Sequence, residues 1–260
     1  FWALSEDQIR TMADAIDSRF AVKVVVYLRR QDRAFESSFN QRTKMRRVAI
    51  DLSDPLEQDS DIQRMDYFAG VENWARVFGA DNIVVRPYEK RELPDGTIPD
   101  FLRVLGIDPA QARGLKHPKR VENLSLTLAG LDFVRLLPLD APPWQGKFLA
   151  DVDAAMRPST PILTSNGAPT VLTSERRRTL IKRFAASNTA LARKYLGRED
   201  GELFREPVAF DEPEPQGGLL GRAELAGLAR SLWLNARRRA RRREKFMLVL
   251  MRMLASVVAV

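Results

Sequence analysis

Residues 22–41 read VKVVVYLRRQDRAFESSFNQ, and the fold is decided in this stretch. Val22–Leu28 is a short, nearly continuous run of β-branched and apolar residues. Such a run is typical of a strand buried on both faces of a parallel sheet, because alternation with polar residues is expected where one face meets water. A polar segment follows at once, and we predict a helix over residues 32–47.

Strands and helices alternate along the rest of the chain. Residues 82–86 predict a second strand, closed by Pro87. Ser5 and Gln8 form a capping box that opens the first helix, and Gly79 is expected to end the helix over 62–78 in the left-handed conformation. Helical spacing of apolar residues predicts helices over 5–20, 62–78, 99–105, 124–137, 144–157 and 174–196.

This order of elements predicts the α/β class, with a parallel sheet and flanking helices. Two strands are too few for a stable parallel sheet. We therefore expect further strands, which either escape these patterns or lie outside the sequence.

The composition excludes several classes of protein. The 260 residues are 45% hydrophobic and 29% charged, which allows a packed core and excludes collagen-like and wholly disordered chains. The chain has no cysteine, which excludes a disulfide scaffold, a thiolate zinc site and a cysteine nucleophile. Its single histidine, His117, excludes a histidine-rich metal centre.

The net charge of +8 is confined to the C-terminal part of the sequence. Residues 222–260 hold nine Arg and one Lys against two Glu, so the residues before them carry no net charge. We predict an α/β domain over 1–206, a linker rich in Pro and Gly over 207–218, and a basic amphipathic C-terminal helix over 219–260.

The basic segment suits three roles. Its cluster RRRARRREK (237–245) precedes an apolar run of 15 residues that contains Arg252 and is shorter than the ~20 residues needed to cross a bilayer. Such a segment suits the surface of a membrane rich in anionic lipid. It could also fold back on the domain with its arginines in water. RNA binding is the third role, but no aromatic residues interleave with the arginines, so we expect no nucleic-acid partner.

Arg29, at the end of the first strand, and Ser37, in the helix that follows, are candidate phosphate-binding residues. Arg29 follows the strand, and Ser37 lies eight residues later, two turns into the predicted helix. At the carboxyl end of a parallel strand, an arginine fork, a hydroxyl and the N–H groups of a helix N-terminus can clamp a phosphate. Alternatively, Arg29 and Arg30 only solvate the strand end, and Ser37 lies at the surface.

The strand, the arginine and the serine resemble the 3′-phosphate-binding segment of sulfotransferases that use PAPS (3′-phosphoadenosine-5′-phosphosulfate). VVVYLRRQD (24–32) is similar to bacterial sulfotransferase-like proteins associated with surface-polysaccharide modification. A helix with Trp74, then FGADNIVVRPYEKREL (78–93) and DFLRVLGID (100–108), follow in the order of that family.

The resemblance covers roughly residues 20–135. It implies a P-loop nucleotide-binding fold in which Arg29 and Ser37 bind the 3′-phosphate of PAPS. Arg30 and Ser38 have the same spacing, so a shift by one residue stays open.

The phosphosulfate loop of that family, of P-K-[ST]-G-T-[ST] character, does not occur in this sequence, which begins with Phe1 rather than Met. In the family the loop holds the 5′-phosphosulfate through its backbone N–H groups and a lysine. We expect about 40–80 further residues upstream that include this loop and its strand. The DNA preceding the Phe1 codon tests this. Without the loop, the chain is expected to aggregate and to bind no PAPS.

No residue is assigned as the catalytic base. The imidazole of His117 titrates near neutral pH, but it lies beside a proline in a charged loop and does not match the position of the family's base. Arg120 and Asn123 could contact the nucleotide or the acceptor, or Asn123 could cap a helix. Acidic residues could also supply the base, but their spacing selects none of Asp51, Asp54, Glu57, Asp59 and Asp61.

The resemblance implies that the intact protein transfers a sulfuryl group from PAPS to a hydroxyl or amine of a carbohydrate-like acceptor, without a metal. It further implies a cytoplasmic protein, with its basic segment at the inner face of the membrane. The alternative is a non-catalytic protein of the same fold that binds a membrane or a nucleic acid through the basic segment.

Overall fold

The computed structural model describes residues 4–44, 60–114, 125–126, 131, 164–165, 171–208 and 210. The chain divides into two compact units. The first comprises residues 1–35, 56–119 and 174–212, and the second comprises residues 36–55, 120–173 and 213–260. Most of the expected linker and the whole basic helix lie outside the described residues, so the predicted domain boundaries stay predictions.

Two parallel strands form the centre of the first unit. β1 (Val24–Leu28) pairs with β2 (Ile83–Pro87), and Leu28 lies opposite Pro87. Among the described residues, this sheet has two strands. The parallel pair and its flanking helices confirm the predicted α/β class.

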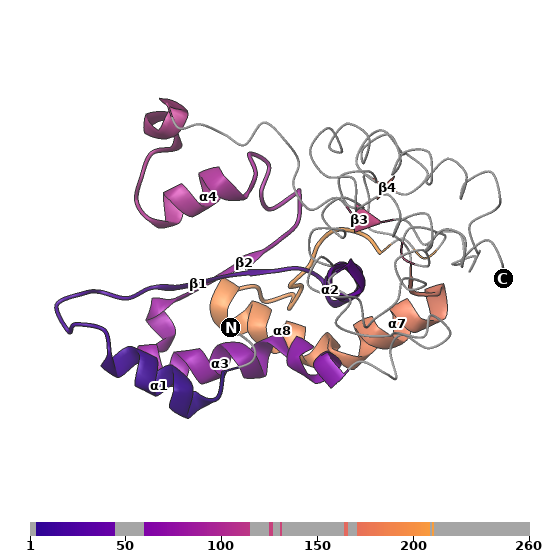
Figure 1. Ribbon diagram of the computed structural model, residues 1–260, viewed down its shortest axis with the longest axis horizontal. Coiled ribbons are helices and arrows are strands. Elements are labelled where there is room, and N and C mark those ends of the chain that lie inside the picture. Colours follow the sequence, from indigo (N-terminus) through magenta and orange to yellow (C-terminus); the bar gives the residue numbers. More distant parts are fainter. Residues whose placement is uncertain are drawn as a thin grey trace, which may run out of the picture. The chain divides into compact units, whose positions relative to one another are not determined.

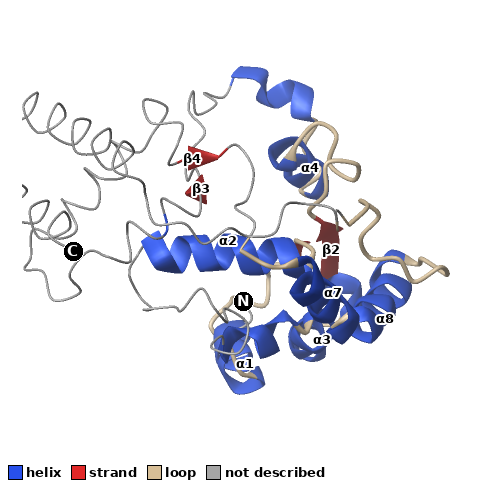
Figure 2. Cartoon of the chain, turned by 90° about the vertical axis from the view of Figure 1, so that its right-hand side faces the viewer, coloured by secondary structure: helices blue, strands red, loops and turns tan. Residues whose placement is uncertain are grey.

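Helices lie on both sides of the strand pair. α3 (Tyr67–Phe78) connects the two strands and packs with α8 (Ala185–Leu196) on one side. α4 (Thr97–Val104) lies on the other side, as Figures 1 and 2 show. α1 (Glu6–Asp14) packs against α3.

β1 is buried on one face rather than on both. Val24, Val26 and Leu28 are buried, whereas Val25 and Tyr27 are partly exposed. The expectation of burial on both faces is therefore wrong. The side that carries Tyr27 faces α4, a helix in which no side chain is buried, so this side is less completely covered.

The capping box of α1 is confirmed, but the helix is shorter than predicted. Ser5 N–H donates to Gln8 Oε1 (2.9 Å), and Gln8 N–H donates to Ser5 Oγ (3.3 Å). The helix ends at Asp14 rather than Phe20. Asp17 accepts from the N–H of Arg19 (2.9 Å), and this local turn competes with further helix.

The single helix predicted over 62–78 is also divided. A 3₁₀ helix spans Ser60–Met65, and α3 begins after Asp66, whose carboxylate accepts from Ala69 N–H (3.0 Å). Asp66 is therefore the N-cap that separates the two segments. Gly79 ends α3 at a positive φ of 85°, as its position predicts, although its ψ of 142° lies outside the left-handed helical region.

The predicted helix over 174–196 consists of two helices. α7 (Ser174–Arg183) and α8 meet at Phe184, whose ψ of 7° departs from the helical range. The ring of Phe184 is buried, as are Leu180 on α7 and Leu191 on α8. The break lets both short helices bury apolar side chains.

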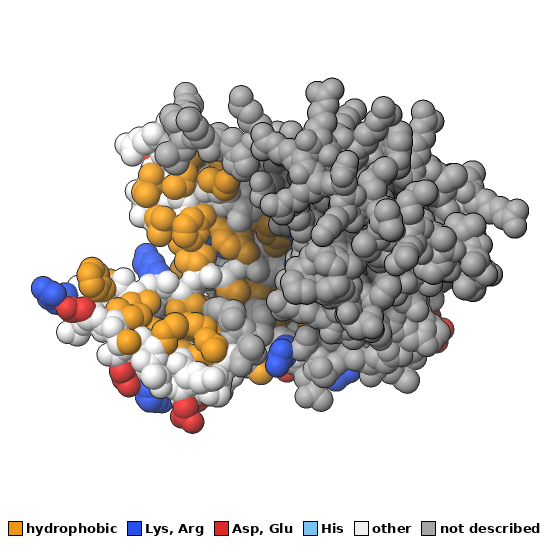
Figure 3. Space-filling view, in the orientation of Figure 1, with side chains coloured by type: hydrophobic (Ala, Val, Ile, Leu, Met, Phe, Trp, Pro, Cys, Tyr) orange, Lys and Arg blue, Asp and Glu red, His pale blue; other side chains and the backbone are white. Residues whose placement is uncertain are grey.

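α4 presents an apolar face to solvent. Thr97–Val104 matches the helix predicted over 99–105, and Gly106 follows it with a positive φ of 74°. Figure 3 shows hydrophobic side chains gathered over α4 and the residues after it, and the exposed ones are Ile98, Phe101, Leu105 and Ile107.

Little of the second unit is described. α2 (Gln31–Lys44) begins in the first unit and continues into the second, and it matches the predicted polar helix as far as Lys44. β3 (Ser125–Leu126) pairs antiparallel with β4 (Thr164–Ser165). The predicted helix over 124–137 is therefore wrong at its start, because the backbone of residues 125 and 126 pairs with another strand. The helix predicted over 144–157 lies outside the described residues.

Candidate anion site at the carboxyl edge of the strands

The carboxyl ends of β1 and β2 bring two sequence motifs together. Arg29 follows β1, and Tyr88 follows β2. The Tyr88 N–H donates to the Leu28 carbonyl (2.6 Å), which continues the parallel ladder by one residue. The register of the strands therefore places the LRR and RPYE segments side by side, at the edge where parallel sheets bind ligands.

Arg29 is held by two tyrosines. Its guanidinium carbon lies 4.7 Å from the centre of the Tyr88 ring, which is a cation–π contact. Its carbonyl accepts a hydrogen bond from the hydroxyl of Tyr67 (2.7 Å), a buried residue at the start of α3. The Arg29 side chain is partly exposed, and no carboxylate among the described residues pairs with it. Among the described residues, this guanidinium therefore lies partly exposed at the strand edge without a counter-charge.

Arg30 has a different environment, although it carries the same side chain. It is buried, and its guanidinium donates to both oxygens of Asp32 (2.8 and 3.2 Å). It also donates to the carbonyl of Glu206 (2.8 Å). Because Arg30 is used inside the fold, the geometry favours Arg29 over Arg30 as the anion-binding residue.

Asp32 lies between two buried arginines. Besides Arg30, it accepts a hydrogen bond at Oδ2 from Arg177 Nη1 (2.6 Å), and Asp32 is fully buried. Burial alone would raise the pKa of Asp32, but the hydrogen bonds and charges of Arg30 and Arg177 outweigh it and lower the pKa. The carboxylate thus stays ionised and joins α7 to the start of α2.

Ser37 and Ser38 both lie on the second turn of α2 and are partly exposed. The division between the two units falls after Phe35, so Arg29 belongs to the first unit and Ser37 to the second. The joint binding of one phosphate by Arg29 and Ser37 therefore stays a prediction.

A carboxylate in the second motif organises the backbone around the edge. Glu89 is buried and accepts from the N–H groups of Arg205 (2.7 Å) and Glu206 (3.2 Å). The Glu206 carboxylate in turn accepts from the Lys90 N–H (2.7 Å). Burial raises the pKa of Glu89, and these N–H donors only partly offset it. Glu89 therefore supports the fold beside Tyr88.

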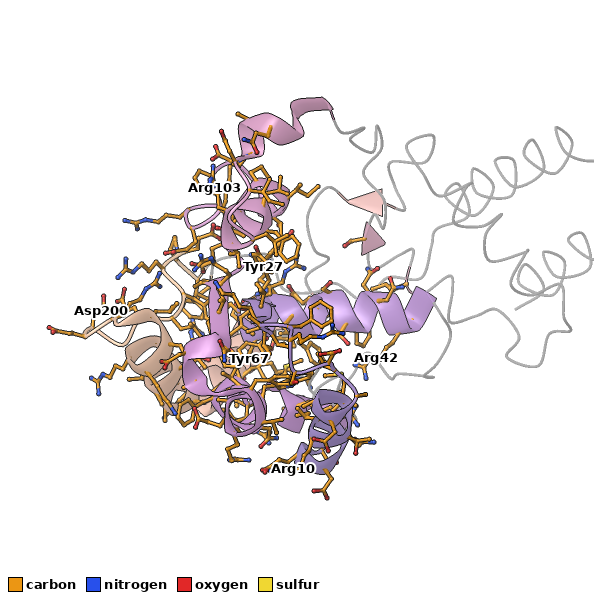
Figure 4. The ribbon with its side chains drawn as sticks, turned by 90° about the vertical axis from the view of Figure 1, so that its left-hand side faces the viewer. Arg10, Tyr27, Arg42, Tyr67, Arg103 and Asp200 are labelled. Atoms are coloured by element: carbon orange, nitrogen blue, oxygen red, sulfur yellow. The ribbon has the colours of Figure 1, made fainter. Side chains whose placement is uncertain are left out.

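Further polar contacts fix the neighbouring segments. The amide of Gln31 exchanges two hydrogen bonds with Asn188 of α8 (2.7 and 3.0 Å). Tyr27, labelled in Figure 4, donates its hydroxyl proton to Asp100 of α4 (2.7 Å), which also accepts from Arg86 (3.2 Å). Burial and the Asp100 hydrogen bond raise the pKa of Tyr27 to about 12, so its hydroxyl stays a donor at neutral pH.

The sequence patterns missed this supporting network. Its partners are up to 176 residues apart, and no local spacing connects Arg30 with Glu206 or Asp32 with Arg177. One signal was available: the polar residues Gln31 and Asp32 lie shortly after a mostly buried strand, which implies polar partners elsewhere in the chain.

The other candidate residues have little or no described structure. His117, Arg120, Asn123 and four of the five acidic candidates lie outside the described residues, and of Asp61 only the backbone, in the 3₁₀ helix, is described. In the part of the chain that the structure covers, no group of three His, Asp or Glu side chains could hold a metal. No helix there is long and apolar enough to cross a membrane.

Comparisons with known proteins yield one relative and no assigned activity. No protein-family model and no solved structure matches the chain. An uncharacterized protein of Archaeoglobus fulgidus is 31% identical over 204 residues, which is 75% of this chain and 52% of that protein. The chain therefore spans about half the length of the curated relative that it matches.

Proposed function

We propose that this chain is part of a sulfotransferase-like protein that transfers the sulfuryl group of PAPS to a hydroxyl or amine of a carbohydrate-like acceptor. One observation carries the proposal: Arg29 presents a partly exposed guanidinium, without a carboxylate partner among the described residues, at the carboxyl end of a parallel strand. A phosphate monoester at this edge would meet a fixed bidentate donor.

The residues at the edge fit the 3′-phosphate of the donor. Arg29 would bind it through the N–H groups of its guanidinium, while the Tyr88 ring and the Tyr67 hydroxyl keep the arginine in place. Ser37 would add one hydroxyl donor from α2. These contacts bind and orient the nucleotide, so their contribution to the reaction is positioning.

The proposed sulfuryl transfer requires neither a redox partner nor a metal. The acceptor oxygen or nitrogen forms a bond to sulfur as the bond between sulfur and the 5′-phosphate oxygen breaks. The acceptor proton leaves to a base, and 3′-phosphoadenosine 5′-phosphate departs with the bonding electrons. The described residues assign no side chain to the role of base.

Binding of 3′-phosphoadenosine 5′-phosphate to the full-length protein tests the proposal. Arg29→Ala is expected to weaken this binding by about 1.5–3 kcal/mol, and Ser37→Ala by about 1 kcal/mol, because each removes a donor to the phosphate. Calorimetry with adenosine 5′-phosphate, which lacks the 3′-phosphate, is the control and should change little. Equal losses for both ligands, or no loss for either, would contradict the proposal.

A further inference from the structure

We infer that Tyr88 is a positioning residue for the anion-binding arginine. The inference deepens the proposed function by assigning a second residue to recognition of the phosphate monoester. Its basis is the contact between the Arg29 guanidinium and the Tyr88 ring, with 4.7 Å from guanidinium carbon to ring centre. This distance is well inside the roughly 6 Å within which a cation is attracted to a ring face.

The contact restricts a side chain that would otherwise be mobile. An arginine at a strand end loses considerable rotamer entropy when it binds a ligand. With its carbon over the Tyr88 ring, the guanidinium is restrained by a contact that uses none of its N–H groups as donors to a carboxylate, so they can still donate to an anion. Tyr88 thus lowers the entropic cost of phosphate binding without touching the phosphate.

The backbone supports the same geometry. The Tyr88 N–H donates to the Leu28 carbonyl (2.6 Å), and the Arg29 carbonyl accepts from the Tyr67 hydroxyl (2.7 Å), so hydrogen bonds fix both chain segments next to the contact between Arg29 and Tyr88. Tyr88 is 41% exposed, and its ring is therefore not needed to fill the core. A partly exposed aromatic residue that contacts a cation at a strand edge, where no described carboxylate pairs with that cation, is better explained by holding it than by packing.

The experiment compares two substitutions in the full-length protein. Tyr88→Leu removes the ring face and is expected to weaken binding of 3′-phosphoadenosine 5′-phosphate about two- to fivefold. Tyr88→Phe retains the ring face and should bind as the natural protein does. Adenosine 5′-phosphate should bind equally well to all three proteins. Tyr88→Gln, which suits an exposed position, replaces the leucine variant if that variant is insoluble.

Two controls separate positioning from other roles. Phe101→Leu removes a ring of matched exposure (42%) on α4 and should leave binding of the phosphorylated nucleotide unchanged. In an Arg29→Ala background, Tyr88→Leu should cause no further loss, because its effect acts through the arginine.

The possible outcomes distinguish this inference from the proposed function. If Arg29→Ala weakens binding but Tyr88→Leu does not, Tyr88 has no positioning role and the proposed function stands. If Tyr88→Leu weakens both nucleotides equally, or has the same effect in the Arg29→Ala background, Tyr88 acts independently of Arg29 and the inference is wrong. If Arg29→Ala has no effect, the proposed function itself fails.

Discussion

Asp32 is the carboxylate that the buried arginines Arg30 and Arg177 share. It is fully buried and pairs with Arg30 and Arg177, whose side chains are 9% and 1% exposed. Asp32→Asn keeps the shape but removes the buried carboxylate that Arg30 and Arg177 share. Loss of one partner from a buried ion pair costs about 3–5 kcal/mol, and we expect this decrease in the free energy of unfolding, measured by urea denaturation.

Asp17→Asn is the matched control. Its carboxylate also pairs with an arginine, Arg19, but both side chains are exposed and screened by water, so the loss of stability should be much smaller than at Asp32. A loss at Asp32 as small as that at Asp17 would contradict the role assigned to Asp32. The pH dependence gives a second check: because the pKa of Asp32 is lowered by folding, its contribution disappears as the pH falls below about 4. The asparagine variant should lack this part of the acid sensitivity.

Glu89 should show the opposite dependence on pH. Burial raises its pKa above the ordinary value of 4.5, so its protonated form is favoured by the fold. Its contribution to stability is complete below that value and is lost as the pH rises through the higher folded pKa. We therefore expect the natural protein to lose stability relative to Glu89→Gln as the pH rises from about 4 to 7, measured by thermal unfolding.

Glu6→Gln provides the contrast for Glu89. Hydrogen bonds from Arg76 and Arg10 lower the pKa of Glu6, so its contribution should be lost in acid instead. If both variants showed the same sign of pH dependence, the assignment of a raised pKa to Glu89 would be refuted.

The sequence alone does not distinguish Arg29 from Arg30 as the anion-binding arginine. Both follow the strand, and both have a serine eight positions later. They differ in the structure because Arg30 has the partner Asp32, whose second arginine, Arg177, is 145 residues away. Only the tertiary structure shows that Arg30 stabilises the fold, whereas Arg29 contacts Tyr88.

Among the elements, α3 and α8 are coupled at a helix cap. Asp66 caps α3 through Ala69 N–H (3.0 Å) and accepts from the hydroxyl of Ser187 on α8 (2.6 Å), which itself accepts from Phe68 N–H (3.1 Å). Asp66→Ala should lower the free energy of unfolding by about 1–2 kcal/mol, because an N-cap is lost. The check is a double-mutant cycle with Ser187→Ala, in which the two losses should not add.

Ser5→Ala is the control for this cycle. It removes the cap of α1, at an expected cost of about 1 kcal/mol, but Ser5 and Ser187 lie on different helices and share no hydrogen bond, so the two losses should add. Strict additivity of Asp66→Ala and Ser187→Ala would show that the cap and the interhelix bond act separately.

Local signals predicted the elements better than their ends. The reciprocal side chains of Ser5 and Gln8 and the positive φ of Gly79 follow from chemistry within a few residues, and both are found. The breaks at Asp66 and Phe184 depend on Ser187 and on the burial of an aromatic ring, which belong to tertiary packing. Apolar periodicity continues through both breaks, so it predicted one helix where two segments exist.

For the whole molecule, the separation of charge along the chain predicts membrane association. Residues 222–260 carry the entire net charge of +8, and each cation near an anionic membrane contributes about 1 kcal/mol. We expect the protein to sediment with vesicles that contain phosphatidylserine and to be released by high salt.

Removal of residues 219–260 should abolish this association, whereas vesicles of neutral lipid should bind neither form. Salt-independent binding to both kinds of vesicle would instead indicate burial of apolar surface. Binding that survives the removal would place the contact elsewhere in the chain.

The class of the fold could be predicted because its two strands carry their signal locally. Val24–Leu28 and Ile83–Pro87 are apolar runs with a helix between them, and parallel pairing follows from that order. The P-loop type and the use of PAPS depend on the resemblance and stay proposals. The division of the chain into two units, each built from three separate segments, could not be predicted, because contacts between distant segments leave no pattern in either segment alone.

The sequence separation of 176 between Arg30 and Glu206 affects how the protein is synthesised. The first unit takes its last segment from residues 174–212, so roughly 90 residues must be translated after residue 119 before it can close. At ribosomal speeds of about 5–20 residues per second, this takes about 5–20 s. During that interval the nascent chain exposes β1, β2 and the Arg30–Asp32 ion pair, which still lacks Arg177 and the Glu206 carbonyl. We expect a requirement for chaperones at this stage of synthesis, and slower translation of residues 120–173 should increase the amount of aggregated product.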